Sequence, residues 1–265
     1  MICAGVDGGS RAIKIVVLRA GGGGVVASGV RDQGVDHDRL AHELFDQLLA
    51  CEGLARSDVA RVVATGYTRG AISFADTTVT EITCHAAGVH HGVPGAATVV
   101  EIGGQDSKLL RLAPGGRVRD FTMNDRCAAG TGRFLEVVAS RLGVGLDGLG
   151  EMARASDAPA SISSTCVVFA ETEIIGLLAT GERPENIVAG VQASIASRVA
   201  AMMGRNADPP VVFTGGVAMI PGMADALASA IGVEVAVAPQ PQMTGALGAA
   251  IVAFRQAGGA APGGL

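Results

Sequence analysis

The sequence predicts a soluble α/β protein with two lobes, and three observations support this fold class. Residues 4–18 and 98–112 repeat one plan, in which an apolar strand, a glycine-rich turn and a second apolar strand form a β-hairpin. Each hairpin is followed by further strand and helix patterns. The chain has 265 residues, 49% of them hydrophobic, which is enough to bury a sizeable core. We therefore expect two lobes, residues 1–94 and 95–265, with a cleft between them.

The first lobe is predicted to contain three strands, a helix and a fourth strand. A turn at residues 21–24 leads from the first hairpin into a third strand near residues 25–30. The fourth strand, residues 59–64, is apolar and ends at Thr65 and Gly66. Between these strands, leucines at helical spacing predict an amphipathic helix: Leu40, Leu44, Leu48 and Leu49.

Helices dominate the second lobe. Apolar residues at helical spacing predict helices at about 130–142, 166–180 and 184–204. The stretch 210-PVVFTGGVAMIPG-222 predicts a buried strand that runs into a glycine pair. The last predicted helix, residues 242–255, is rich in small residues, and we expect it to pack back on the first lobe.

The charge and the apolar pattern of the chain argue against two classes of partner. A formal net charge of -5 and a pI of about 5.5 leave no broad basic surface for a nucleic-acid backbone. The first residues lack the features of a signal peptide, and no apolar stretch approaches the length of a membrane span. We therefore expect a cytoplasmic protein that binds neither nucleic acid nor membranes.

Three glycine pairs follow predicted strands: Gly8-Gly9, Gly103-Gly104 and Gly215-Gly216. Glycine lets the backbone approach a ligand closely and aims N–H groups at phosphate oxygens. Any one pair is equally compatible with a plain turn. Three pairs, two of them in matched hairpins, favour a nucleotide site. The chain contains neither a G-x-x-x-x-G-K-[ST] string nor a G-x-G-x-x-G string after its first strand, so the site is not a P-loop or Rossmann type.

Charged residues flank the first two glycine pairs. Asp7 ends the first predicted strand and is a candidate ligand of Mg²⁺, which prefers a few carboxylates and keeps much of its hydration. Lys14 and Lys108 are candidate contacts for phosphate. Asp106, in the second hairpin, is a candidate to orient water or metal from the other lobe.

Two of the five cysteines are predicted to lie where helices begin. Cys127 precedes Ala-Ala-Gly-Thr-Gly, and Cys166 follows a Ser-Ser-Thr run that is a natural N-cap region. Helix N-termini favour negative groups. The 38 residues between them exclude a local Cys-x-x-Cys site. Two thiolates are half of a four-thiolate cluster, so two copies of the chain would supply all four.

The other three cysteines are expected to be buried and inert, which is usual for thiols in a reducing compartment: Cys3, Cys51 and Cys84. His85 follows Cys84 in a helix pattern, and we interpret it as a structural residue.

A resemblance to a known family covers nearly the whole chain. It is carried, in order, by GVDGGSRAIK, ATGYTRG, EITCHAAG, EIGGQDSK, MNDRCAAGTGRFLE, SSTCVVFAETE, FTGGVA and GALGAA. These strings resemble the ATPase activators (component A) of 2-hydroxyacyl-CoA dehydratases, in the BadF/BadG/BcrA/BcrD ATPase family, which also holds ATPase subunits of benzoyl-CoA reductase. The first loop departs from the family pattern, because it reads DGGS and continues with Arg11, where relatives more often carry a small residue.

The resemblance implies an acetate and sugar kinase, Hsc70 and actin type of ATPase fold, which is ribonuclease H-like, with ATP and Mg²⁺ in the cleft. It implies an ATP-hydrolysing activator that delivers a low-potential electron to a 2-hydroxyacyl-CoA dehydratase. It also implies a [4Fe-4S] cluster shared between two subunits of a homodimer, and reduced ferredoxin or flavodoxin as the electron donor.

By motif, the resemblance also assigns roles to residues of this chain. Asp7, Gln105 and Asp106 are expected to be catalytic. Cys127 and Cys166 are expected to bind the cluster. Cofactor-binding residues are expected in the two phosphate loops, in the segment after Cys127 and in an adenosine motif: Gly8, Gly9, Ser10, Lys14, Gly103, Gly104, Gly130, Thr131, Gly132, Gly215 and Gly216.

Three other functions compatible with this fold stay open. One is the ATPase subunit of a benzoyl-CoA reductase-type enzyme. Another is a small-molecule kinase, which would need a base beside a bound hydroxyl and a substrate-recognition insertion, and the sequence offers no obvious candidate for either. The third is an actin-like assembly protein, which would leave the paired cysteines unexplained.

Overall fold

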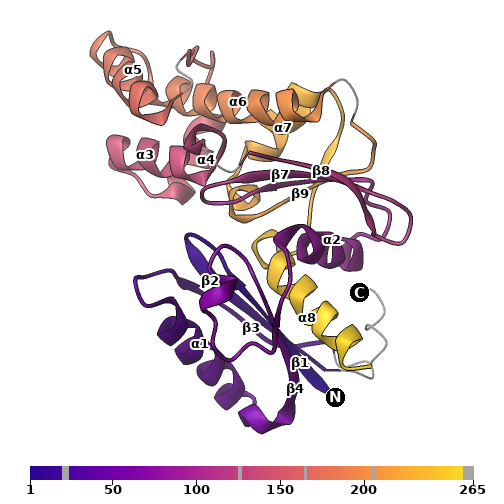
Figure 1. Cartoon of the computed structure of the whole chain (residues 1–265). Coiled ribbons are helices and arrows are strands. Elements are labelled where there is room, and N and C mark those ends of the chain that lie inside the picture. Colours follow the sequence, from indigo (N-terminus) through magenta and orange to yellow (C-terminus); the bar gives the residue numbers. More distant parts are fainter. Residues whose placement is uncertain (20–23, 125–126, 164–165, 205–206, 259–265) are drawn as a thin grey trace. The chain divides into compact units, whose positions relative to one another are not determined.

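The computed structural model of the chain describes residues 1–19, 24–124, 127–163, 166–204 and 207–258. They form two α/β units (Figure 1). The first unit comprises residues 1–96 and 112–119 and the chain from residue 238 onward. The second unit comprises residues 97–111 and 120–237.

The first unit contains a five-stranded sheet in the order β3-β2-β1-β4-β5. Its strands are β1 (Ile2–Gly8), β2 (Ala12–Arg19), β3 (Gly24–Asp32), β4 (Val59–Thr65) and β5 (Thr77–Thr78). β2 is antiparallel to β1 and β3, whereas β4 is parallel to β1. The predicted hairpin, third strand and fourth strand are confirmed. The two-residue β5 was not predicted, because it is too short to leave a pattern of alternation.

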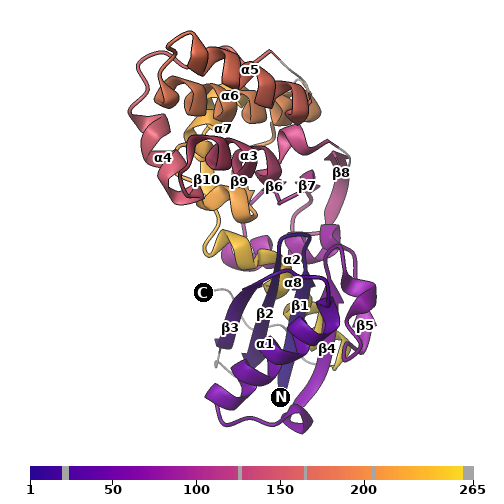
Figure 2. The same ribbon diagram turned by 90° about the vertical axis from the view of Figure 1, so that its left-hand side faces the viewer.

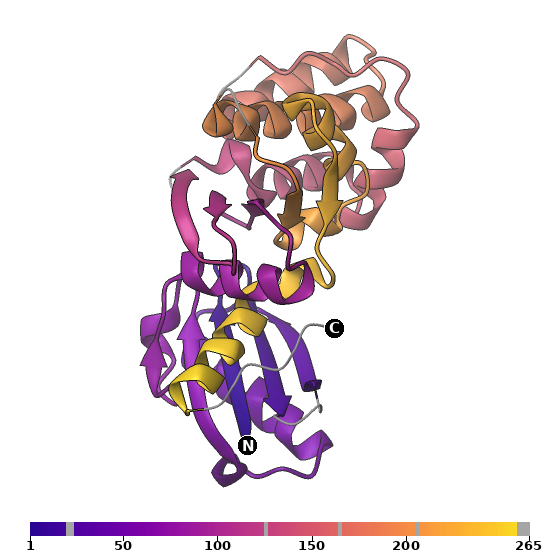
Figure 3. The same cartoon turned by 90° about the vertical axis from the view of Figure 1, so that its right-hand side faces the viewer.

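Helices cover both faces of this sheet, as Figures 1 and 3 show. The helices of the unit are α1 (His37–Cys51), α2 (Glu81–Gly92) and α8 (Thr244–Gln256). On one face, α1 buries Leu44 and Phe45 against side chains such as Ile15. On the other face, α8 packs against β1 and β4 and against α2. Thus α8, the predicted helix 242–255, belongs to the first unit.

Backbone, rather than side chains, fills the contact that α8 makes with β1 and α2. A Cβ atom on Gly5 would lie 2.1 Å from the carbonyl oxygen of Ala246, and one on Gly248 would lie 1.7 Å from that of Cys84. A Cβ on Gly88 would lie 2.0 Å from the carbonyl oxygen of residue 244. Only glycine fits at such distances. The absence of side chains brings the first turn of α8 close to the end of β1.

The second sheet has the order β10-β9-β6-β7-β8. Its strands are β6 (Thr98–Ile102), β7 (Ser107–Leu112), β8 (Val118–Asn124), β9 (Val211–Thr214) and β10 (Val235–Val237). β6 is antiparallel to β7 and parallel to β9, and β10 is parallel to β9. The second sheet therefore repeats the topology of the first, with β6 and β7 in the places of β1 and β2.

The helices of the second unit lie close to one another in Figure 2, and they bury apolar side chains in one core. They are α3 (Gly132–Leu142), α4 (Leu146–Arg154), α5 (Val167–Ala179), α6 (Pro184–Met203) and α7 (Met223–Ile231). α6 contacts α4, α5 and α7. The predicted helices near 130–142, 166–180 and 184–204 are confirmed, whereas α4 and β10 are short and were not predicted. Across the described residues, every helix is too short or too polar to cross a bilayer.

Candidate functional site

Asp7, near the end of β1, is a buried carboxylate with 5% of its surface exposed. It faces Lys14 on β2 in antiparallel register, and Lys14 Nζ lies 3.1 Å from Asp7 Oδ2. A buried carboxylate needs such a partner, because an unpaired charge is costly to remove from water. The hairpin therefore places a carboxylate and an ammonium group beside the first glycine pair.

The turn between β1 and β2 has no space for a side chain at Gly8 or Gly9. A Cβ on Gly9 would lie 2.7 Å from Lys14 Nζ, and one on Gly8 would lie 2.4 Å from Thr68 Oγ1. Ser10 lies in the same turn and is half-buried. The structure thus brings together the predicted residues of the first phosphate loop, with their backbone open to close approach.

Asp7 in the first hairpin and Glu101 in the second each lie close to a glycine. That glycine directly follows the parallel strand beside the acid. Gly66, after β4, has a φ of +91°, and a Cβ on it would lie 2.4 Å from Asp7 Oδ1. Gly215, after β9, has a φ of +93°, and a Cβ on it would lie 2.8 Å from Glu101 Oε1. Both positions require glycine, for backbone conformation and for space. Gly66 was not among the predicted site residues.

The start of α8 lies against the other side of the Asp7 carboxylate. A Cβ on Gly245 would lie 2.9 Å from Asp7 Oδ2 and 3.2 Å from His85 Cε1. His85, on α2, is 5% exposed, and its Nδ1 lies 3.0 Å from Thr244 Oγ1. The imidazole and the carboxylate therefore face the same glycine. His85 has the buried hydrogen bond of a structural residue, yet it also belongs to the surroundings of Asp7, which the sequence did not indicate.

The second hairpin repeats the pairing of an acid with a lysine. Glu101 on β6 faces Lys108 on β7 in register, and Lys108 Nζ lies 2.9 Å from Glu101 Oε2. In both hairpins the acid and the lysine are 7 residues apart. Lys108 Nζ also lies 2.8 Å from Asp106 Oδ2. The Lys108 side chain is 2% exposed, against 15% for Lys14. Lys108 is thus held between two carboxylates.

Glu101 has the position in the second hairpin that Asp7 has in the first. The sequence motifs point to Asp106 and Gln105 as catalytic residues instead. In the structure Asp106 is partly exposed and pairs with Lys108, and Gln105 is exposed in the turn. An alignment of the two hairpins, residue by residue, would have found Glu101, because it places both acids opposite both lysines.

The second glycine pair is bonded to the start of α3. The backbone N–H of Gly132 donates to the carbonyl of Gly103 at 2.9 Å, and that of Arg133 donates to the carbonyl of Gly104 at 3.0 Å. Two of the N–H groups that a helix start leaves unpaired are thus satisfied by this loop. The loop and the helix start form one continuous backbone structure.

A third bond joins the same two segments. Ser107, the first residue of β7, is 1% exposed, and its hydroxyl donates to the carbonyl of Gly130. Thr131 is fully buried and caps α3, because its hydroxyl accepts from the N–H of Arg133 at 3.3 Å. The predicted Gly130, Thr131 and Gly132 therefore make up the connection between the second loop and α3. Ser107 was missed, since a serine in a strand carries no sequence signal.

The third glycine pair lies beside the second loop. Gly215 follows β9, and Gly216 begins a 3-10 turn, Gly216–Met219. A Cβ on Gly215 would lie 2.4 Å from the carbonyl oxygen of Ile102 at the end of β6. The structure therefore brings the predicted adenosine motif and the second phosphate loop together within the second unit.

The two predicted cluster ligands differ in their local structure. Cys166 is exposed and is the N-cap residue of α5, and its carbonyl accepts from the N–H of Ala170 at 2.8 Å. Cys127 is half-buried and precedes a 3-10 turn, Ala128–Gly130, while α3 begins only at Gly132. Both cysteines therefore lie where a helical segment begins, as expected, but the segment that Cys127 caps is a 3-10 turn that precedes the predicted helix, α3. The reason is that Thr131, rather than the cysteine, caps α3.

The other cysteines are less suited to bind metal. Cys3 and Cys84 are fully buried, as expected, whereas Cys51 is exposed at the end of α1, contrary to expectation. Burial raises the pKa of the Cys84 thiol to about 12 and also raises the pKa of Cys3. Metals bind the thiolate, so these two buried thiols are poor ligands at neutral pH.

Cys127 and Cys166 supply two thiols that are at least partly open to a ligand. Within the described ranges, no group of three or more His, Cys, Asp or Glu side chains is placed to hold a metal ion. The donor set of one chain is thus half of that of a four-thiolate cluster, and it fits such a cluster only when a second chain supplies the other half. Residues 125–126 and 164–165, which precede each cysteine, lie outside the described residues.

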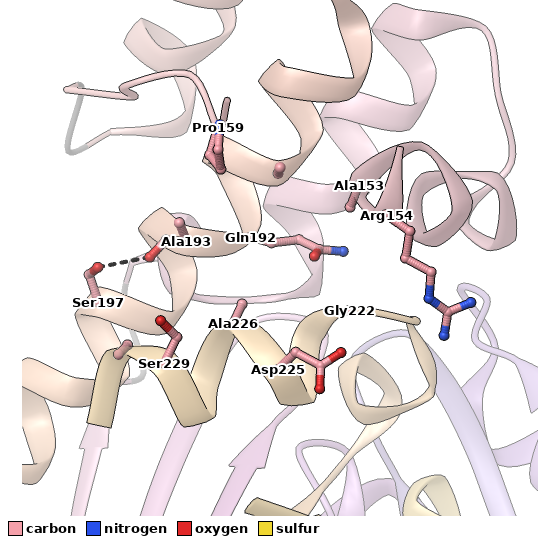
Figure 4. Close-up of a pocket in the computed structure, with 12 residues that line it drawn as sticks. Ala153, Arg154, Pro159, Gln192, Ala193, Ser197, Gly222, Asp225, Ala226 and Ser229 are labelled. Carbon is pink, nitrogen blue, oxygen red and sulfur yellow. Dashed lines mark hydrogen bonds between the residues drawn. The ribbon is translucent and has the colours of Figure 1, made fainter. Parts of the chain in front are cut away.

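A groove on the helices of the second unit lies apart from all of these residues (Figure 4). It is lined mainly by small side chains of α6 and α7, together with Gln192, Asp225 and, from α4, Arg154. None of the predicted site residues lines it. The chemistry of the chain is concentrated at the two hairpins and the two cysteines instead.

Comparison with known proteins connects these features. The sequence model of the BadF/BadG/BcrA/BcrD ATPase family matches residues 4–253. The activator of lactoyl-CoA dehydratase from Anaerotignum propionicum is 44% identical over 258 residues, which cover 97% of this chain and 99% of that protein. One of the subunits of benzoyl-CoA reductase from Thauera aromatica is 33% identical, over 94% of this chain and 92% of that protein.

Solved structures agree with this relationship. The activator of the 2-hydroxyisocaproyl-CoA dehydratase from Clostridium difficile, with bound ADPNP, superimposes with a TM-score of 0.91 at 43% identity, covering 97% of this chain and 96% of that chain. A ROK family glucokinase from Streptomyces griseus has a TM-score of 0.60 at 14% identity, covering 97% of this chain and 100% of that chain, and this shows the fold alone. The predicted acetate and sugar kinase, Hsc70 and actin type of fold is thereby confirmed.

Proposed function

Because the chain belongs to the BadF/BadG/BcrA/BcrD ATPase family, we propose that it is an ATP-hydrolysing activator that delivers a low-potential electron to a 2-hydroxyacyl-CoA dehydratase. The observation that carries the proposal is the match, over nearly the full length of both chains, to a relative named as the activator of lactoyl-CoA dehydratase. The two acid–lysine hairpins and the two accessible cysteines supply the groups that this function needs.

ATP with Mg²⁺ is the proposed nucleotide. A relative with the same fold binds ADPNP, and the buried Asp7 has the few-carboxylate character that hydrated Mg²⁺ prefers. The backbone N–H groups of both glycine turns and the ammonium group of Lys14 would bind phosphate oxygens. Gly215 and Gly216 would contact adenosine. In hydrolysis, Asp7, Gln105 and Asp106 would orient the cation and the attacking water.

A [4Fe-4S] cluster is the proposed electron carrier, held by Cys127 and Cys166 of each subunit in a homodimer. Such a cluster supplies one-electron chemistry at low potential. The N-terminus of α5 directs N–H groups toward Cys166, which favours the negative charge of a ligated thiolate. We further propose a cytoplasmic protein, with reduced ferredoxin or flavodoxin as donor and the dehydratase as acceptor.

The test is purification without oxygen. The proposal predicts a brown dimer with four irons and four acid-labile sulfides per two chains, which transfers electrons to a dehydratase only when ATP is present. Cys127→Ala and Cys166→Ala should abolish the colour while nucleotide binding is retained. Cys51→Ala is the matched control, since Cys51 is also exposed and should keep the colour. A colourless monomer with ATPase activity would overturn the proposal.

One alternative has an observation of its own. The similarity to a subunit of benzoyl-CoA reductase extends over almost the whole chain, so an ATPase subunit of a reductase of this type is the second candidate. Reconstitution separates the two. On the proposal, this chain alone would form a homodimer that binds the cluster, and a cluster that forms only when a second, different chain is added would favour the reductase subunit. The alternative of a small-molecule kinase is supported only by the similarity in fold to a glucokinase.

A further inference from the structure

We propose that Ser107 is a positioning residue that ties Cys127 to the second glycine loop, so that a nucleotide bound at this loop acts on Cys127 rather than on Cys166. This inference rests on the proposed function, because it assigns a direction to the coupling between nucleotide and cluster. It follows from the different hydrogen bonds that hold the two cysteines.

The connection on the Cys127 side has three parts. The N–H of Gly130 points at the carbonyl of Cys127 at 3.4 Å, and the carbonyl of Gly130 accepts from the Ser107 hydroxyl. Ser107 directly follows Asp106 of the second loop and precedes Lys108. Hydrogen bonds therefore lead from the loop to the cysteine through a single residue, Gly130.

The turn between Cys127 and α3 is stiff. Thr131 donates to the carbonyl of Ala128 twice, from its N–H at 3.1 Å and from its hydroxyl at 2.8 Å, and its side chain is fully buried. The N–H groups of Gly132 and Arg133 are bonded to the glycine pair of the loop. A displacement of the loop must therefore move the whole segment 128–133, because packed and bonded segments shift as units.

Among the described residues beside Cys166, the side-chain hydrogen bonds of Ser163 are local to α5. The N–H and the hydroxyl of Ser163 both donate to Glu173 Oε1, at 2.9 and 2.8 Å, and this fixes Ser163 to α5. Cys166 is then the N-cap of the same helix. An ion pair of Arg141 with Glu171 joins α3 to α5, but Arg141 is half exposed to water, where such pairs contribute little. Cys166 is thus connected to the loop only through the packing of α5 against the core that it shares with α3, whereas Cys127 is joined to the loop by hydrogen bonds through Gly130.

Two matched substitutions test the proposal in the anaerobically purified dimer. Ser107→Ala removes the hydroxyl that bonds Gly130, and Ser163→Ala removes a hydroxyl that bonds Glu173 beside the other cysteine. The readouts are the electron paramagnetic resonance spectrum of the reduced cluster and the rate at which a chelator removes its iron. Each is measured with ADP and with a non-hydrolysable ATP analogue.

The nucleotide-dependent difference in chelation rate should fall by about three- to tenfold in Ser107→Ala, as for other residues that carry coupling between sites. Ser163→Ala and Ser107→Thr, which keeps a hydroxyl, should respond as the unmodified protein does. The inference is overturned when Ser107→Ala keeps the full response, or when Ser163→Ala loses as much. A merely structural role of Ser107 would lower the melting temperature without changing the response to nucleotide.

Hydrogen exchange of the unmodified protein gives a second test, which does not depend on the folding of a variant. When ADP replaces the ATP analogue, the protection of the amides of Gly132 and Arg133 against hydrogen exchange should change more than that of the amides of Ser163 and Ala170. Equal changes on both sides would contradict the inference. A dimer that holds no iron, or that shows no nucleotide response at all, contradicts the proposed function instead.

Discussion

The first and second hairpins share a topology and an acid–lysine pair, but their lysines differ in freedom. Lys14 has one carboxylate partner and a side chain that is 15% exposed. Lys108 has two carboxylate partners and is 2% exposed. The same backbone plan therefore gives one lysine that can reach a phosphate and one that holds a loop together. The two hairpins thus share the geometry of the acid–lysine pair, and the neighbouring side chains determine whether the lysine can bind a ligand.

The largest expected effect that separates the two lysines is the loss of stability in Lys108→Met. This substitution leaves Glu101 and Asp106 close together without their cation, and the loss of one partner of a buried ion pair costs about 3–5 kcal/mol. Denaturant unfolding of the apoprotein measures this loss. Lys14→Met should cost less, about 1–3 kcal/mol, and should weaken nucleotide binding. Equal losses of stability in the two variants would show that the lysines have the same role.

Asp7→Asn should lower ATP hydrolysis by about a hundredfold, since it removes the carboxylate that would hold Mg²⁺ and orient water. The iron content of the proposed dimer should stay unchanged, because Asp7 belongs to the first unit and the two cysteines proposed to bind the cluster belong to the second. Asp120→Asn, at an exposed position on β8, is the control and should hydrolyse ATP at the normal rate. Steady-state ATPase assays and iron analysis measure both effects. Normal turnover of the Asp7→Asn variant would show that Asp7 has no catalytic role.

Gly245→Ala should lower ATP hydrolysis by about tenfold, because its Cβ would lie 2.9 Å from Asp7 Oδ2 and a displaced carboxylate misplaces what it binds. Gly176→Ala is the matched control. It adds the same atom to the last turn of α5, at a position where nothing lies within 4 Å. The control should leave hydrolysis unchanged and stabilise the fold by about 0.5–1 kcal/mol. A normal rate in Gly245→Ala would mean that Asp7 tolerates movement.

Cys84 offers the smallest and most local probe, since burial and, to a lesser degree, the charge of Asp7 raise the pKa of its thiol to about 12. A thiol whose pKa is raised on folding stabilises the protein at and below the ordinary thiol pKa. This contribution is lost as the pH rises from 9.0 toward about 12. In Cys84→Ala, the melting temperature should therefore fall less steeply across that range. Parallel pH profiles for both proteins would contradict the burial effect.

Much of the fold could be predicted from the sequence, because long periodic segments such as 184–204 and the paired hairpin patterns determine helices and strands directly. The pairing of Asp7 with Lys14 also follows from local spacing, since antiparallel strands with a short turn bring residues seven apart into register. Short elements such as β10 and α4 carry too few residues for a periodic pattern.

The rest of the site depends on contacts between residues that are distant in sequence. His85 and Thr244 are 159 residues apart, and nothing in the local pattern of either indicates their hydrogen bond. The bond from Ser107 to Gly130 and the approach of Gly245 to Asp7 are of the same kind. The apolar pattern after Cys127 predicts a helix but does not show where it begins, because the competing cap at Thr131 decides that point.

The backbone contact of Gly5, Gly88 and Gly248 has a consequence for sequence variation. At these positions even the smallest side chain would have to displace a main-chain carbonyl group. In a saturation mutagenesis library, these three glycines should tolerate fewer replacements than many of the charged residues of the proposed nucleotide site. They take part in no reaction, yet they fix how closely a helix can approach the strand that ends beside Asp7.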